Sequence, residues 1–237
     1  MTLLRDTRFV VLDTETTGLD PETDQVIDLS LVEVSKRGIV PLYETRIDPK
    51  RPIPPESSAV HHLTDRDVAG KPTLDAVWPT VLDHLQDAVL VAHNASFDRA
   101  MLPETHRPWV CSKRMAQHLW PDAPNHKNQT LRYYLGIDVD AEPAHSAAGD
   151  TWVTAHVFWR ELGEYRSRVA QTDGLEEFLA WANSPIEVKK MPFGKHRGKL
   201  IKQLPTDYIR WALANVEEMD ADLRHSMERV LKDGVGA

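Results

Sequence analysis

Apolar and polar positions near the start of the chain alternate in short runs that predict strands. Residues 9–12 are four apolar residues in succession, which is typical of a strand buried on both faces. Residues 26–34 and 42–47 predict two further strands, which are separated by a turn at Arg37-Gly38. Because these three strands follow one another with short connections, the pattern indicates an antiparallel meander.

Later apolar residues recur at the three- and four-residue spacing of amphipathic helices. The pattern predicts helices over residues 73–86, 96–103, 112–120, 130–135 and 145–162, and a short buried strand over 88–92. The proline-rich stretch 48–55 is expected to be an extended surface loop, because proline lacks the N–H that a sheet requires. The whole pattern predicts an α/β fold, in which helices flank a mixed sheet.

The pattern changes after Gly163. Residues 164–186 are polar and carry an apolar stripe, so we expect a helical linker there. Residues 187–202 hold six lysines and arginines and one glutamate, a net charge of +5 in a chain of net charge −8, which leaves −13 for the rest. We therefore expect a main domain at 5–163 and a small basic α+β module at 187–235.

Composition limits the class of protein. The 237 residues are 41% hydrophobic and 27% charged, which is ordinary for a globular protein. The single cysteine, Cys111, excludes an internal disulfide and suits a reducing compartment. No signal peptide or run of eighteen apolar residues is visible, so we expect a cytoplasmic protein without a membrane partner. The negative net charge does not exclude nucleic acid, because basic residues can cluster away from acidic metal ligands.

Four carboxylates are candidates for chemistry. Asp13 and Glu15 end the first strand on one face, where like charges repel unless a divalent cation lies between them. The alternative is a pair of surface carboxylates that flank a turn. Asp98, in the first turn of a helix, and Asp150, on the long helix, would project toward the same place. Together the four could surround two Mg²⁺ or Mn²⁺ ions, which prefer oxygen ligands. His145, five residues before Asp150, has a pKa range suited to accepting a proton near neutral pH.

Three sequence motifs resemble those of a known family. They are Asp13-Thr14-Glu15, the stretch 93–98 (His-Asn-Ala-Ser-Phe-Asp) and the stretch 145–150 (His-Ser-Ala-Ala-Gly-Asp). In this order, over roughly residues 8–162, they resemble the DEDDh (DnaQ-like) 3′→5′ exonucleases. A related branch has a tyrosine at the position of Ser146. The resemblance implies a ribonuclease H-like fold with a five-stranded mixed sheet.

The resemblance also implies residue roles. The metal ligands would be Asp13, Glu15, Asp98 and Asp150, and His145 would be the general base. The residues implied to contact the nucleotide at the 3′ end are Thr16, Leu19, His61, Asn94 and Phe97. For Thr16 and Leu19 the alternative is a helix cap or a core contact, and Phe97 either stacks on a base or belongs to the core. At His62 the family usually has glycine.

The basic module contains a glycine-rich turn, Met191-Pro-Phe-Gly-Lys-His-Arg-Gly-Lys199. Its two glycines allow the chain to bring lysines close to a phosphate. The module, with helices expected from Pro205 and over 221–231, resembles the C-terminal part of one exonuclease of the family. We predict that Lys195, Arg197 and Lys199 bind the phosphates of a single or displaced strand. A solvated basic face or a docking surface for another protein is the alternative.

The leading hypothesis is a metal-dependent 3′→5′ exodeoxyribonuclease, which removes 5′-mononucleotides from single-stranded or frayed DNA ends in repair. An exoribonuclease is the first alternative, because a metal site alone does not distinguish the two sugars. A polymerase proofreading subunit would carry a polymerase-binding tail instead of the basic module. A catalytically inactive nucleic-acid-binding adaptor would have lost a metal ligand. The sequence leaves the oligomeric state open.

Overall fold

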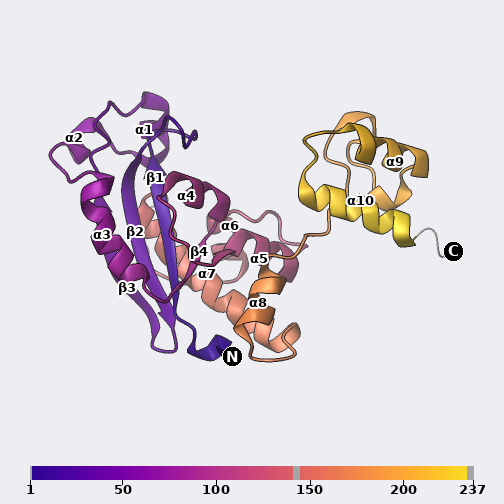
Figure 1. Ribbon diagram of the computed structural model, residues 1–237, viewed down its shortest axis with the longest axis horizontal. Helices are drawn as coiled ribbons and strands as arrows, with labels where there is room; N and C mark the ends of the chain where they lie inside the picture. The colour runs from indigo at the N-terminus through magenta and orange to yellow at the C-terminus, as the bar shows by residue number, and fades with distance from the viewer. Residues whose placement is uncertain (1, 141–144, 234–237) are drawn as a thin grey trace. The chain divides into compact units, whose positions relative to one another are not determined.

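The computed structural model describes residues 2–140 and 145–233, which form two compact units (Figure 1). The first unit is Met1–Asn183 and the second is Ser184–Ala237. Within the described residues, no helix has the length and apolar character needed to cross a membrane.

A five-stranded sheet organises the first unit, with the strand order β3-β2-β1-β4-β5. The strands are β1 (Phe9–Thr16), β2 (Val26–Ser35), β3 (Gly38–Arg46), β4 (Val89–Ala92) and β5 (Trp109–Cys111). The first three form the expected antiparallel meander. β4 pairs with β1 in parallel, and β5 pairs with β4 in the same way. This mixed sheet confirms the predicted ribonuclease H-like fold class.

Helices cover both faces of the sheet and the ends of its strands (Figure 1). The helices of the first unit are the 3-10 helix η1 (Leu4–Asp6), α1 (Pro55–His61), α2 (Asp65–Val68), α3 (Leu74–Leu85), α4 (Ala95–Met101), α5 (Ser112–Leu119), α6 (Asn128–Tyr134), α7 (Ala147–Arg168) and α8 (Leu175–Ala182). The proline-rich stretch runs directly into α1, which differs from the loop expected through residue 55. Pro55 is the first residue of this helix, a position where the missing N–H of proline is no loss.

Alternation along β1 sends its side chains into two cores. Phe9 and Val11 pack against residues of α5, α7 and α8 on one face. Val10 and Leu12 pack against residues of α3 and α4 on the other. By the same alternation, the side chains at positions 13 and 15 follow Phe9 and Val11 on the face that α7 covers.

Residues 164–186 are not the helical linker that the sequence predicts. α7 continues to Arg168, and α8 follows with Phe178 fully buried. The ring centroid of Phe178 lies 5.8 Å from that of Phe9 and 5.1 Å from that of Tyr165. The apolar stripe correctly indicated a helix. Its spacing could not show that this helix packs into the core between the sheet and α7.

The second unit encloses a small core of its own. Its helices are the 3-10 helices η2 (Gly194–His196) and η3 (Ile201–Gln203), α9 (Thr206–Asn215) and α10 (Ala221–Asp233). Met191, Ile209 and Met227 are buried together in this core. The expected basic turn is closed by a bridge between Lys190 and Leu200. Gly194 and Gly198 within this turn have φ values of 68° and 83°, which only glycine adopts readily.

Candidate active site

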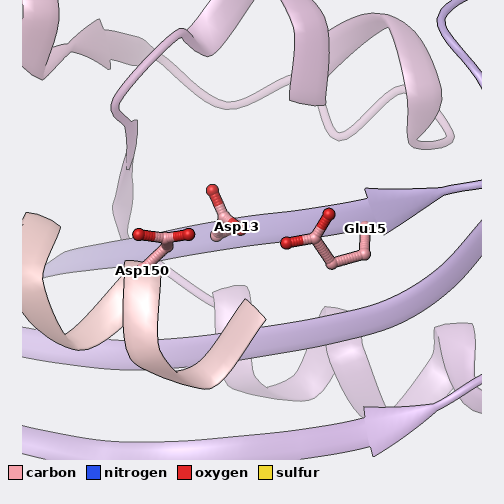
Figure 2. A group of neighbouring side chains, drawn as sticks. All are labelled: Asp13, Glu15 and Asp150. Carbon is pink, nitrogen blue, oxygen red and sulfur yellow. The ribbon is translucent and has the colours of Figure 1, made fainter. Parts of the chain in front are cut away.

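Three carboxylates converge beside the end of β1 (Figure 2). Asp13 and Glu15 come from the strand, and Asp150 comes from the first turn of α7. One oxygen from each carboxylate lies within 4.8 Å of the other two. Figure 2 shows the side chain of Asp150 reaching from the helix toward the two side chains on the strand. The structure thus brings together three of the four predicted metal ligands.

The fourth predicted ligand, Asp98, approaches β1 from α4. Its Oδ1 accepts hydrogen bonds from the backbone N–H of Thr14 over 3.1 Å and from the Thr14 hydroxyl over 2.9 Å. Asp98 is buried and lines the same cavity of about 560 Å³ as the other three carboxylates. It therefore belongs to the site, although it lies outside the three-residue group.

Burial and mutual repulsion raise the pKa values of the site carboxyls. Burial raises the pKa of Asp13 well above its ordinary value, and the charges of Asp98, Glu15 and Asp150 raise it further. Burial and the charges of Asp150, Asp28 and Asp98 raise the pKa of Glu15 to about 8. Burial raises the pKa of Asp98 to about 6, against the hydrogen bonds from Thr14. Such a group keeps its negative charges near neutral pH only beside added positive charge, and its oxygens suit a hard divalent cation.

His145 lines this cavity together with the four carboxylates. Its backbone N–H donates a hydrogen bond to Oδ2 of Asp150 over 2.9 Å. Its φ is 67°, in the left-handed region that non-glycine residues rarely adopt. The residue predicted to be the general base therefore lies next to the metal-ligand candidates, just before α7.

Two amide side chains of α6 hold Asp150, and neither was predicted from the sequence. Nδ2 of Asn128 donates to the backbone oxygen of Asp150 over 3.0 Å, and Nε2 of Gln129 donates to its Oδ1 over 3.3 Å. α6 packs against α7, which places these amides beside the carboxylate. Neither residue belongs to a motif, so no spacing signal pointed to them.

Asp28 of β2 is a further acidic residue, whose charge raises the pKa values of Asp13 and Glu15, and the sequence motifs did not include it. It pairs with Glu15 across the two strands, and burial raises its pKa to about 6. Its carboxylate accepts a hydrogen bond from the backbone N–H of Ala147, the first residue of α7. The bond links β2 to the helix that carries Asp150. The signal was available as an aspartate inside an apolar strand (Val-Ile-Asp-Leu).

A second cavity, of about 660 Å³, adjoins the first. Both are lined by Thr14, Glu15 and Phe97, and Phe97 also packs against the core. Leu19 lines the second cavity and is 82% exposed, so its apolar side chain is open to a ligand. The hydroxyl of Thr16, at the same cavity, donates to the backbone oxygen of Gly18 over 2.6 Å, which closes the turn.

The remaining predicted substrate residues lie in three places. Asn94 lines the first cavity just before α4. His61 lines the second cavity and is buried, and its Nδ1 accepts a hydrogen bond from the backbone N–H of Leu63 over 3.0 Å. His62 has a φ of 62°, a left-handed conformation that favours glycine, which is the residue that the resemblance implies at this position. The exposed residues Lys195, Arg197 and Lys199 belong to the second unit.

Comparison with known sequences finds similarity over nearly the whole chain. The family whose model is described as "Exonuclease" matches residues 10–158. Exodeoxyribonuclease 10 of Escherichia coli (strain K12) is 30% identical over 231 residues, which cover 94% of this chain and 98% of that protein. DNA polymerase III subunit epsilon of Treponema pallidum (strain Nichols) is 32% identical over 160 residues, which cover 63% of this chain and 74% of that protein.

Solved structures that resemble this chain are also exonucleases. Exonuclease X in complex with 5′ overhanging duplex DNA has a TM-score of 0.61 and 30% identity, and the match covers 72% of this chain and 99% of that chain. Exonuclease I of E. coli in complex with a dA16 oligonucleotide has a TM-score of 0.55 at 14% identity, over 69% of this chain and 41% of that chain, and shares the fold alone. A separate family described as "Putative quorum-sensing-regulated virulence factor" matches residues 184–216.

Proposed function

The chain belongs to the exonuclease family, and from this premise we propose that it is a metal-dependent 3′→5′ exodeoxyribonuclease. It hydrolyses the terminal phosphodiester bond at a DNA 3′ end and releases a 5′-mononucleotide. The observation that carries the proposal is the convergence of Asp13, Glu15 and Asp150 within 4.8 Å. Asp98 and His145 line the same cavity. DNA as the substrate is supported by the similarity to exodeoxyribonuclease 10, which covers 94% of this chain.

The carboxylates of the site fit a pair of divalent cations. The donor set is made of oxygen atoms, and the raised pKa values of Asp13 and Glu15 reflect negative charge that a cation would stabilise. We assign Asp13, Glu15, Asp98 and Asp150 as the residues that would hold two ions, Mg²⁺ or Mn²⁺. Two such ions bound there would polarise the phosphodiester and would stabilise charge on its attacking and leaving oxygens.

Other residues of the site position these groups and move a proton. His145 accepts the proton of the attacking water, for which imidazole is suited near neutral pH. Thr14 fixes Asp98 through its two hydrogen bonds, and Asn128 and Gln129 fix Asp150. Held in this way, the carboxylates need little rearrangement when substrate binds.

The second cavity receives the terminal nucleotide. Leu19 packs against its base, while Thr16 and His61 line the cavity around it. Asn94 and Phe97 contact the nucleotide where the two cavities meet. An exposed apolar side chain at this place favours an unpaired or frayed base, because only such a base can leave its stack. In the second unit, Lys195, Arg197 and Lys199 bind strand phosphates. Removal of such 3′ ends fits a role in DNA repair.

The proposal is tested with oligonucleotides that carry a label at the 5′ end. Single-stranded DNA, blunt duplex DNA and RNA of one sequence are incubated with the chain in Mg²⁺ and in EDTA. We expect single-stranded DNA to shorten stepwise in Mg²⁺ only, with the label kept on the shortened strand and mononucleotides released. Faster shortening of RNA would instead identify an exoribonuclease. Absence of any metal-dependent cleavage would identify a nucleic-acid-binding adaptor.

A further inference from the structure

Three rings form a row on the second unit, beside its basic turn. Tyr208 and Trp211 lie on α9, three residues apart, with ring centroids separated by 5.8 Å and ring planes inclined by 30°. His196 of the turn meets Tyr208 edge-on at a centroid distance of 4.3 Å. Nζ of Lys195 lies 5.3 Å from the centroid of the Tyr208 ring. We call His196, Tyr208 and Trp211 the aromatic row.

Trp211 ends the aromatic row and is exposed. Its side chain is 55% exposed, whereas Ile209 and Ala212 of the same helix are buried in the core of the unit. The ring centroids of Trp211 and Tyr208 are too close for a base to fit between them, so a base would have to stack on the face of Trp211 turned away from Tyr208. Most of the Trp211 side chain therefore lies outside the core of the second unit.

The row lies within the basic part of the chain. From residue 189 to residue 211 there are seven lysines and arginines and one acidic residue, Asp207. Lys195 and Lys199 of the turn are exposed, and so is Arg210, next to Trp211. A stacking surface combined with positive charge is the chemistry that binds a single strand, in which the faces of the bases and the phosphates are both accessible.

We propose that the aromatic row is a stacking platform for the unpaired bases of a single-stranded nucleic acid. A base lies on the face of Trp211 turned away from Tyr208, Tyr208 supports the indole from behind, and Lys195 neutralises a phosphate beside it. The inference rests on the proposed function, since it takes the substrate to be a nucleic acid. It assigns residues that bind the bases, in addition to the basic residues that bind the phosphates. Because every base has a π-face, this recognition is tolerant of sequence.

The experiment measures the affinity of the full chain for fluorescent oligonucleotides by anisotropy, in EDTA so that nothing is cleaved. The probes are an oligothymidylate of about 20 nucleotides and a strand of the same length made of abasic sites. We expect Trp211→Ala to bind oligothymidylate about tenfold more weakly, the loss typical of one stacked base. Its affinity for the abasic strand stays that of the wild type. Trp211→Phe keeps an aromatic face and retains most of the affinity.

Two controls separate stacking from charge and from general damage. Trp159→Ala removes another half-exposed tryptophan, on α7 of the first unit, and leaves both affinities unchanged. Lys195→Gln weakens binding to both strands and reduces the salt dependence, by about 0.7 in the logarithmic slope for each lost phosphate contact. Trp211→Ala leaves this slope unchanged.

The stacking proposal is overturned if Trp211→Ala binds oligothymidylate like the wild type, or if it loses as much affinity for the abasic strand. The first result would fit a surface that contacts a protein instead, and the second would mean that the row only supports the basic turn. Metal-dependent cleavage of a short oligonucleotide by the wild type is measured alongside. If cleavage persists while the stacking prediction fails, only the stacking proposal is lost. If the wild type neither cleaves nor binds, the proposed function falls with it.

Discussion

The first unit buries acidic side chains in two different surroundings, namely the group of carboxylates at the site and the lone carboxyl of Glu161. At the site, Asp13, Glu15 and Asp150 face one another across a cavity, and both burial and mutual repulsion raise the pKa values of Asp13 and Glu15. Glu161, on the same helix as Asp150, is fully buried in the interior of the unit. Burial raises its pKa well above the ordinary value, and Ser112 donates a hydrogen bond to its Oε1 over 3.0 Å.

The difference separates the proposed metal site from a lone buried carboxyl. Within the described chain, Glu161 joins no group of potential metal ligands, and its Oε2 has no hydrogen-bond partner. A lone carboxyl in this position avoids the cost of burial by taking up a proton. Several carboxyls that share a cavity can instead be stabilised together by cations. Burial alone therefore does not point to a metal site, whereas burial combined with convergence at a cavity supports the proposed one.

The largest effect is expected for Asp13→Asn. We expect its 3′→5′ cleavage rate to fall by about a thousandfold, because metal ions supply several kcal/mol of transition-state stabilisation. The measurement is the release of mononucleotides from single-stranded DNA in Mg²⁺. Glu161→Gln is the matched control and should cleave at the wild-type rate. A rate for Asp13→Asn above one tenth of the wild-type value would contradict the metal assignment.

His145→Ala should lower the rate by about a hundredfold, which is the lower range for loss of a general base. Added imidazole should restore part of the rate by replacing the missing side chain. His225→Ala, which removes an exposed histidine of α10, serves as the control and should change nothing. Full activity of His145→Ala, or a loss that imidazole leaves unchanged, would argue against proton transfer by this residue.

Asp28→Ala should lower kcat by roughly tenfold with little change in KM, because α7 loses its hydrogen bond at Ala147 and Asp150 is held less well. Asp28→Asn keeps an oxygen that can accept this bond and should retain more of the rate. Steady-state kinetics of the two variants test the point. Equal kcat values for Asp28→Ala and the wild type would show that Asp28 does not position the helix.

The smallest effect is on stability and concerns Glu161. Because its pKa in the folded chain lies above that in the unfolded chain, its contribution is fully present below the ordinary value of 4.5 and is lost as the pH rises toward the folded value. Glu161→Gln cannot ionise, so its free energy of unfolding should rise relative to that of the wild type between pH 4.5 and pH 7. Urea unfolding at both pH values measures this. A constant difference between the two proteins would mean that Glu161 does not titrate on unfolding.

The sequence predicted those parts of the fold and site that follow from local patterns. The meander and the placement of Asp13 and Glu15 follow from strand periodicity, and the resemblance in three motifs pointed to Asp98, His145 and Asp150. Contacts between elements distant in the chain were not predictable from spacing. The support of Asp150 by Asn128 and Gln129 depends on how α6 packs on α7, and the place of Phe178 depends on how α8 meets the sheet. The sequence shows the type of each of these residues, but tertiary packing determines which residue it contacts.

Calorimetric titration of Mn²⁺ into the metal-free chain tests the central claim most directly, because it needs neither DNA nor turnover. Mn²⁺ should bind the wild type and Glu161→Gln with the same stoichiometry and affinity. Asp13→Asn should lose at least one ion or bind much more weakly, since it lacks a carboxylate shared by the group. Binding by Asp13→Asn that equals the wild type would contradict a metal site built on the end of β1.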